Sequence, residues 1–306
     1  MVVSPYRLLL AGDEPLGSPW RTGAALLNIR CDFGSMRDAM GRAMFHPFWL
    51  TLVEDGRLKE WQEWAARWQA EGHTHVVLAR RYAYPGSPIP GKDFTPSRFV
   101  ELVRFALLQG FAPILMLSDT PDEAPLVLDI VQRLTAGGLL PYVICVPAWE
   151  PIPTRDWTSK QLSDLLIAMQ AAGGDALVLG VHLQPGRWSM SSHPLEPDDP
   201  WQGSESGCWK SHGGEHVSVF LYQLEHGFTQ TTAPDWQNRW RDGVPRLGNG
   251  MNGWRRIPIC LFETVLFDSY RGHCDARRAR EIATEARDIA WTEFGVPITY
   301  GNGVPL

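Results

Sequence analysis

Two glutamates stand where long apolar runs of the chain end. Glu150 follows the run VICVPAW, and Glu263 follows the run IPICLF. A carboxylate in such a place needs a reason, because burying an unpaired charge is costly. Two carboxylates that face each other across a bound molecule can cleave a glycosidic bond, since one protonates the leaving oxygen and the other attacks or stabilises the oxocarbenium-like centre. A glutamate after an apolar strand is also typical of the first residue of a solvated loop, so the hypothesis depends on whether both residues reach one site.

The elements that must position these glutamates alternate along the chain. Short apolar runs are followed by loops and then by longer amphipathic runs, which is typical of βα units around a parallel sheet. The short runs are nearly continuous in apolar residues, as expected for strands covered on both faces. Strands are predicted at 48–54, 75–81, 112–118, 141–148, 176–183, 217–224, 257–263 and 296–300. Glu150 and Glu263 therefore follow or end the fourth and the seventh strand.

Helices are predicted between the strands from periodicity and from their end signals. Thr95 and Thr158 are suitable N-caps, and glycine follows several of the predicted helix ends. The predicted helices are 57–71, 96–109, 124–136, 158–172 and 275–294.

The predicted fold class is α/β, and the arrangement that we favour is a (β/α)8 TIM barrel. An open doubly wound sheet would also fit, but no GxGxxG or GxxxxGK[ST] follows the first strand. We expect an N-terminal extension over 1–44 and a barrel domain over 45–306. Within the extension, 5–30 could form a hairpin that plugs the barrel bottom and 35–44 a helix; alternatively, 24–30 is the true first strand. The long loops 184–216 and 226–256 follow strands and would lie on the C-terminal face, where barrel active sites are built.

With these placements the chain resembles the clan of retaining (β/α)8-barrel glycoside hydrolases, in which the acid/base ends strand four and the nucleophile ends strand seven. The resemblance covers roughly 45–303 and depends on order and placement more than on a dense motif. It implies that Glu150 is the acid/base and Glu263 the nucleophile. It also implies that Tyr222, near the end of strand six, bonds the nucleophile, and that Arg80 or Arg81, ending strand two, orients it.

The chain departs from the clan at two positions. The clan usually has asparagine before the acid/base, where it holds the sugar 2-hydroxyl, and this chain has Trp149 there. The clan often has tryptophan on strand eight, where the nearest residues here are Tyr300 and Asn302. Substrate-binding roles are predicted for six residues near the strand ends: Arg81, Asp119, Trp149, His182, Tyr222 and Tyr300.

Other candidates have weaker sequence signals. Glu225 and His226 follow strand six and could act as a substitute pair, while Asp268, Tyr270 and His273 follow strand seven closely enough to reach the barrel mouth. A loop holds several possible metal ligands without a recurring ligand spacing, so we predict no metal site and no cofactor. Those loop residues are His193, Glu196, Asp198, Asp199, His212 and His216.

The composition bounds the partners. The formal net charge of -6 argues against nucleic acid, and no apolar run is long enough to span a bilayer. The 14 tryptophans, many in predicted loops, are natural partners for the flat faces of sugars. The start of the chain lacks the features of a signal peptide, so we expect a cytoplasmic protein or a part of a viral particle.

The first hypothesis is therefore a retaining O-glycosidase that acts on a poly- or oligosaccharide. It predicts that the two carboxyl groups lie about 5–5.5 Å apart, whereas a separation near about 8 Å would favour inversion. The second hypothesis is a non-catalytic carbohydrate-binding barrel that serves in a larger assembly, and it is motivated by Trp149. The third is a different barrel enzyme that uses the histidine-rich loop and would lose activity on chelation.

Overall fold

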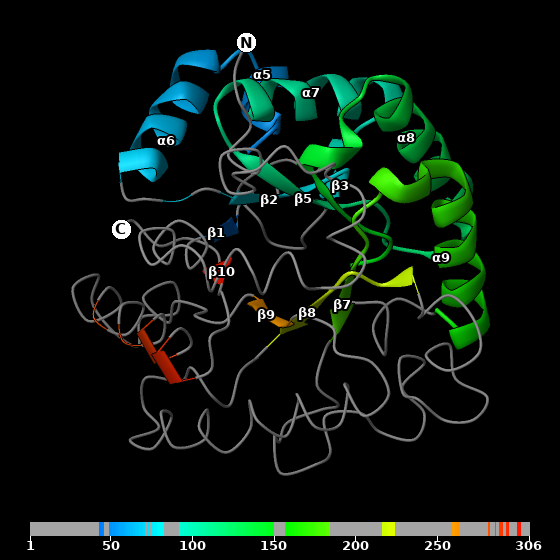
Figure 1. The fold of residues 1–306 in the computed structure, drawn as a ribbon. Coiled ribbons are helices and arrows are strands. Elements are labelled where there is room, and N and C mark those ends of the chain that lie inside the picture. The colour runs from blue at the N-terminus through cyan, green and yellow to red at the C-terminus, as the bar shows by residue number, and fades with distance from the viewer. Residues whose placement is uncertain are drawn as a thin grey trace.

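The computed structural model of the chain is an α/β fold in which helices lie outside parallel strands (Figure 1). The structure describes residues 43–45, 49–70, 73, 75–82, 92–149, 157–183, 216–223, 259–262 and 299–300, together with the helical residues 281, 285, 288, 289, 292 and 293. The helices α6 to α9 form an outer arc, and the strands lie inside it (Figure 1).

The parallel strands follow one another in space in the order in which they occur along the chain. One sheet has the order β10-β1-β2-β5-β6, and a second has the order β7-β8-β9. A parallel bridge between Cys145 and Leu179 links β6 to β7, and β9 contacts β10. Within the described residues no hydrogen-bonded ladder joins β9 to β10. These eight strands are β1 (Ala43–Phe45), β2 (His75–Ala79), β5 (Ala112–Met116), β6 (Ile144–Val146), β7 (Gly180–Leu183), β8 (Val219–Gln223), β9 (Ile259–Phe262) and β10 (Thr299–Tyr300).

The helices confirm most of the periodicity-based predictions. Thr95 caps α7 by accepting a hydrogen bond from the Arg98 N–H, and Thr158 forms a capping box with Gln161 at the start of α9. The described residues between 281 and 293 are helical, in agreement with the predicted helix 275–294. The helices of the described segments 49–70, 92–149 and 157–183 are α5 (Thr51–Glu54), α6 (Leu58–Ala70), α7 (Pro96–Leu108), α8 (Ala124–Ala136) and α9 (Ser159–Gly173), with 3-10 turns at Pro121–Glu123, Leu140–Tyr142 and Gly174–Ala176.

The prediction of a first strand at 48–54 is wrong. Residues 51–54 form the short helix α5, and the first parallel strand of the described residues is β1, which pairs with both β2 and β10. The alternative first strand 24–30 and the hairpin predicted over 5–30 lie outside the described residues. The run is as buried as a strand would be, because Trp49 stacks on Trp61 with ring centroids 4.4 Å apart and donates its indole N–H to the Trp61 carbonyl. A short buried helix and a buried strand have the same apolar pattern. Ala43 and Met44 lie in β1, so the helix predicted for 35–44 does not extend over them.

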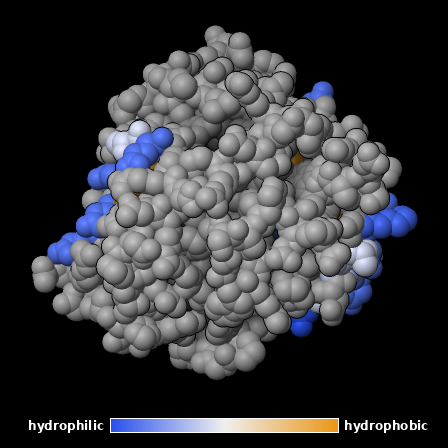
Figure 2. Space-filling model, turned by 90° about the horizontal axis from the view of Figure 1, so that it is seen from below, coloured by the Kyte–Doolittle hydropathy of each residue, from blue (hydrophilic) through white to orange (hydrophobic). Residues whose placement is uncertain are grey.

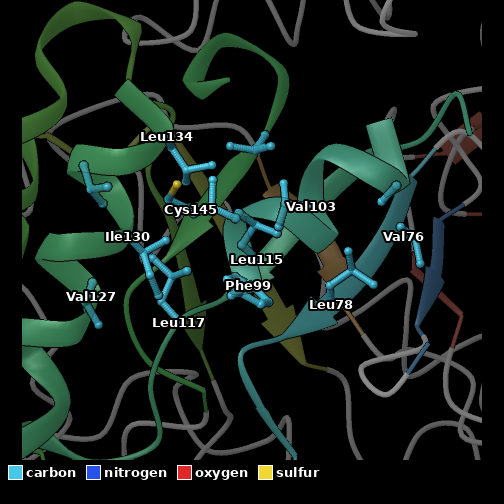
Figure 3. Packing of buried hydrophobic residues seen from close by; sticks show 14 of the residues in the cluster. Val76, Leu78, Phe99, Val103, Leu115, Leu117, Val127, Ile130, Leu134 and Cys145 are labelled. Carbon is cyan, nitrogen blue, oxygen red and sulfur yellow. The ribbon is translucent and has the colours of Figure 1, made fainter. Parts of the chain in front are cut away.

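One large hydrophobic cluster lies between the helices and the faces of the strands that point toward them. Val76 and Leu78 of β2 and Leu115 of β5 pack against Phe99 and Val103 of α7 (Figure 3). Cys145 of β6 belongs to the same cluster, and burial raises the pKa of its thiol to about 12, as expected for an unreactive core cysteine.

The opposite strand faces are buried as well. The register places Val77, Ile114 and Ile144 in one row across β2, β5 and β6. A second row consists of Ala79, Met116 and Val146, and all six side chains are buried. Rows of apolar side chains from neighbouring parallel strands are what fills the interior of a (β/α)8 barrel.

Gly180 of β7 marks how tightly this interior is packed. A Cβ at this position would lie 2.8 Å from Ile144 Cγ2, 3.2 Å from Val146 Cγ2 and 3.4 Å from Leu221 Cδ1. The methyl groups of β6 and β8 therefore occupy the space that a side chain at 180 would need.

We expect Gly180→Ala to lower the free energy of unfolding by about 1–3 kcal/mol, because the added methyl overpacks the interior. Urea denaturation measures this change. The same substitution should cost less in an Ile144→Ala background, where the closest methyl is absent. Equal costs in the two backgrounds would show that the interior is not packed as described.

Candidate active site

The carboxyl ends of β2, β5 and β6 meet at one edge of the sheet, because the three strands are parallel and in register. The chain leaves this edge through Arg80 and Arg81 after β2, through Ser118 and Asp119 after β5, and through Trp149 after β6. Polar residues at this edge are where a barrel builds its active site.

Arg80 is held in a buried ion-pair network. Its side chain is 1% exposed and pairs with Glu123, whose side chain is 8% exposed. Its Nε–H donates to the Leu117 carbonyl at 2.9 Å, and its other terminal nitrogen pairs with Asp93. These partners occupy Arg80 on the helix side of β2, so this guanidinium links the strand ends of β2 and β5 to the start of α8.

Arg81 differs from its neighbour in exposure. Its side chain is 40% exposed, and its Nη1 lies 3.4 Å from Glu123 Oε1. Its backbone pairs with Asp93 in the two-stranded antiparallel sheet of β3 (Arg81–Tyr82) and β4 (Lys92–Asp93). Of the two arginines that the sequence offered, Arg81 is therefore the one whose guanidinium has room for a ligand. The structure keeps it beside Glu123 and does not test the predicted role toward Glu263.

The backbone of Asp119 is fixed from two directions. Its N–H donates to Glu123 Oε2 at 2.7 Å, and its carbonyl accepts from the Trp157 indole N–H at 3.1 Å. The hydroxyl of Ser118, one residue earlier, donates to the Pro147 carbonyl at 2.5 Å, and the Ser118 backbone carbonyl accepts from the Trp149 N–H at 2.9 Å. The segment that carries Asp119 is therefore tied to β6 and to the start of α8.

Electrostatics at this edge favour charged carboxylates. Burial opposes ionisation of Glu123, but hydrogen bonds from the Asp119 N–H and from Arg80, with the charge of Arg80, hold its pKa below the usual range. The pKa of Asp122 is also lowered, chiefly by the hydrogen bond from the Thr120 hydroxyl.

The remaining predicted substrate-binding residues lie in or directly after strands β6, β7, β8 and β10. Trp149 is partly exposed and directly follows the β6 region, while His182 is buried in β7. Tyr222 lies in β8 and Tyr300 in β10, but their side chains are outside the described residues. The structure thus brings Arg81, Asp119 and Trp149 to neighbouring strand ends and leaves His182 within the core.

Glu150 and Glu263 themselves lie outside the described residues, and their roles stay predictions. The strands that precede them are in place: β6 is the fourth and β9 the seventh of the parallel strands that the structure describes. Glu263 is the residue that follows β9 in the sequence. Also outside the described residues are Glu225, His226, Asp268, Tyr270, His273, His193, Glu196, Asp198, Asp199 and His212.

Glu123, Asp93 and Trp157 were not predicted as part of this region. Glu123 stands in the segment DTPDE, which has the composition of an ordinary helix start. A signal was available, because an arginine that continues an apolar strand on its helix-facing side needs a buried carboxylate partner. Which acidic residue is that partner depends on contacts between segments far apart along the chain.

Two further observations concern metal ligands and helix length in the described part. No group of His, Cys, Asp and Glu in it could hold a metal ion, and each of its helices is too short or too polar to cross a lipid bilayer. Where described residues reach the face seen from below, most are hydrophilic (Figure 2).

Comparison with known proteins gives a likeness of fold. No protein-family model matches the chain, and no curated protein matches it. Among solved structures, GH5_18 from Bifidobacterium longum subsp. longum ATCC 55813 has a TM-score of 0.54 at 13% identity, covering 86% of this chain and 69% of that one. A variant of this protein in complex with Manb1-4GlcNAc has a TM-score of 0.53 at 14% identity, again with 86% and 69% covered.

A GH5_18 from Bifidobacterium longum subsp. infantis is similar to the same degree, with a TM-score of 0.53 at 13% identity, covering 86% of this chain and 69% of that one. These proteins are TIM-barrel glycosidases. The chain therefore has a glycoside hydrolase-like fold, as its sequence predicted.

Proposed function

We propose that the chain is a retaining glycoside hydrolase that cleaves a poly- or oligosaccharide with two glutamates, and that its eight parallel strands close into a barrel between β9 and β10. The observation that carries this proposal is the strand order. Among the described parallel strands β6 is the fourth and β9 the seventh, and in a glycoside hydrolase-like fold the residues that follow such strands leave on one side.

In the proposed mechanism Glu263 attacks the anomeric carbon and Glu150 protonates the leaving oxygen. A glycosyl-enzyme ester forms as the glycosidic bond breaks, and Glu150 then takes a proton from the water that hydrolyses the ester. Glu150 must be protonated at the start of each cycle, so it needs a raised pKa, which low-polarity aromatic surroundings such as Trp149 would favour.

The substrate class follows from the same edge of the sheet. Arg81 and Asp119 offer donors and acceptors suited to sugar hydroxyls, and Trp149 offers an aromatic face to a sugar ring. A variant of one structural neighbour binds Manb1-4GlcNAc, so this disaccharide is a reasonable first substrate to test.

The proposal is tested by incubating the protein with Manb1-4GlcNAc and a panel of nitrophenyl glycosides and following release of the sugar. Proton NMR during the first turnovers reads the configuration of the new anomeric centre. We expect hydrolysis of at least one substrate with retention, and the inverted anomer as first product would contradict the mechanism.

A second candidate function is a non-catalytic carbohydrate-binding barrel within a larger assembly. It is favoured by Trp149, which stands where the resembling clan has an asparagine that holds the sugar 2-hydroxyl. Calorimetric binding of Manb1-4GlcNAc, or binding on a glycan array, without any hydrolysis would support this function over the first.

A further inference from the structure

Glu123 has both carboxylate oxygens engaged by groups from different strands. Oε1 lies in the ion pair with Arg80 and 3.4 Å from Arg81 Nη1, while Oε2 accepts the Asp119 N–H at 2.7 Å. The Glu123 side chain is 8% exposed, so its contacts with Arg80 and with the Asp119 N–H are made away from bulk water, whereas Arg81 reaches it with a side chain that is 40% exposed.

Two of these partners are the residues proposed to bind sugar hydroxyls. Arg81 follows β2 and Asp119 follows β5, and the carboxylate of Glu123 contacts both residues. We propose that Glu123 is a positioning residue for substrate binding, which sets the guanidinium of Arg81 and the segment of Asp119 at a fixed distance. This inference rests on the proposed function, because it assigns a role within that same site.

The surrounding contacts explain why a glutamate is needed. Glu123 accepts the N–H of the peptide before the Asp119 side chain, and Trp157 donates to the carbonyl of the peptide after it, so both peptide units that flank this side chain are held. The Asp93 carboxylate balances Arg80, while the Asp93 backbone pairs with Arg81 between β4 and β3. Asp93→Asn therefore removes the carboxylate charge and leaves this backbone pairing in place.

Loss of this positioning should weaken substrate binding more than it slows the reaction. Glu123 acts through Arg81 and Asp119 and not through the two glutamates that react. A displacement of binding groups by a fraction of an ångström removes interactions present in both the ground state and the transition state, which raises KM with little change in kcat.

The test compares Glu123→Gln with Asp93→Asn, a matched control that also removes one carboxylate from Arg80. Glu123→Asp is the second variant, because it keeps the charge that balances Arg80 and shortens the reach to Asp119. Steady-state kinetics use the panel substrate that the wild type hydrolyses fastest, and circular dichroism verifies folding. We expect each Glu123 variant to raise KM about tenfold with kcat within about twofold of wild type, and Asp93→Asn to leave KM unchanged.

A double-mutant cycle adds a measurement that a merely structural role would not move. Asp119→Asn and Glu123→Gln together should raise KM by much less than the product of their separate effects, because both disturb the proposed contact of the Asp119 side chain with the substrate. Equal KM changes in the Glu123 and Asp93 variants would overturn this inference alone. A wild type that neither hydrolyses nor binds any panel sugar would overturn the proposed function, and that result appears before any variant is made.

Discussion

For a substrate whose leaving group is a sugar, Glu263→Gln and Glu150→Gln should each reduce kcat/KM by about 10³-fold or more while leaving folding intact. Removing the nucleophile prevents the glycosyl-enzyme ester from forming, and removing the acid/base deprives the leaving oxygen of its proton. The two losses should differ with the leaving group. A dinitrophenolate needs little protonation, so Glu150→Gln should still form the ester from a dinitrophenyl glycoside and show a burst, whereas Glu263→Gln should not. Stopped-flow absorbance measures the burst.

The matched control is Glu225→Gln, since Glu225 follows the sixth strand and was the rival carboxylate in the sequence. The assignment predicts near wild-type kinetics for this variant. Unchanged turnover in Glu263→Gln together with loss in Glu225→Gln would move the nucleophile to the sixth strand and refute the pairing of strands four and seven.

The strand positions were predictable because each buried parallel strand has its own apolar run. The runs around β2, β5 and β6 are covered on both faces, so their residues are apolar at nearly every position and stand out from the amphipathic helices. The first strand was missed for the same reason. Residues 49–52 are buried as deeply as a strand, but they pack on Trp61 as a turn and a short helix, and burial alone does not tell the two apart.

The candidate site was predictable only in part. Arg81 and Asp119 were expected at strand ends, and the structure places them close together. The partner that holds them was not expected, because an ion pair between residues 80 and 123 depends on which strands are neighbours and on which face of β2 carries Arg80. The residue pattern of a single segment indicates neither which strands are neighbours nor which face of β2 carries Arg80.

The second large effect is expected from Arg80→Met. This substitution leaves Glu123 buried without its main counter-charge, and removing one partner of a buried pair typically lowers the free energy of unfolding by about 3–5 kcal/mol. Urea denaturation at neutral pH measures the change. The matched control is Arg98→Met, because Arg98 also binds two carboxylates, Glu54 and Glu101, but with a side chain 38% exposed. We expect that control to lose about 1 kcal/mol or less.

The pH dependence of the Arg80 variant separates lost charge pairing from lost packing. In the wild type the pKa of Glu123 is depressed on folding, so its contribution to stability is present above the unfolded-state value of about 4.3 and disappears as the pH falls through the folded-state value. Arg80→Met removes the interactions that depress this pKa, so the stability gap between variant and wild type should narrow as the solution is acidified. Adding Glu123→Gln to Arg80→Met should recover part of the loss at neutral pH, because it removes the unpaired charge. A gap that is constant with pH and unaffected by Glu123→Gln would mean that Arg80 stabilises the strand ends by packing alone.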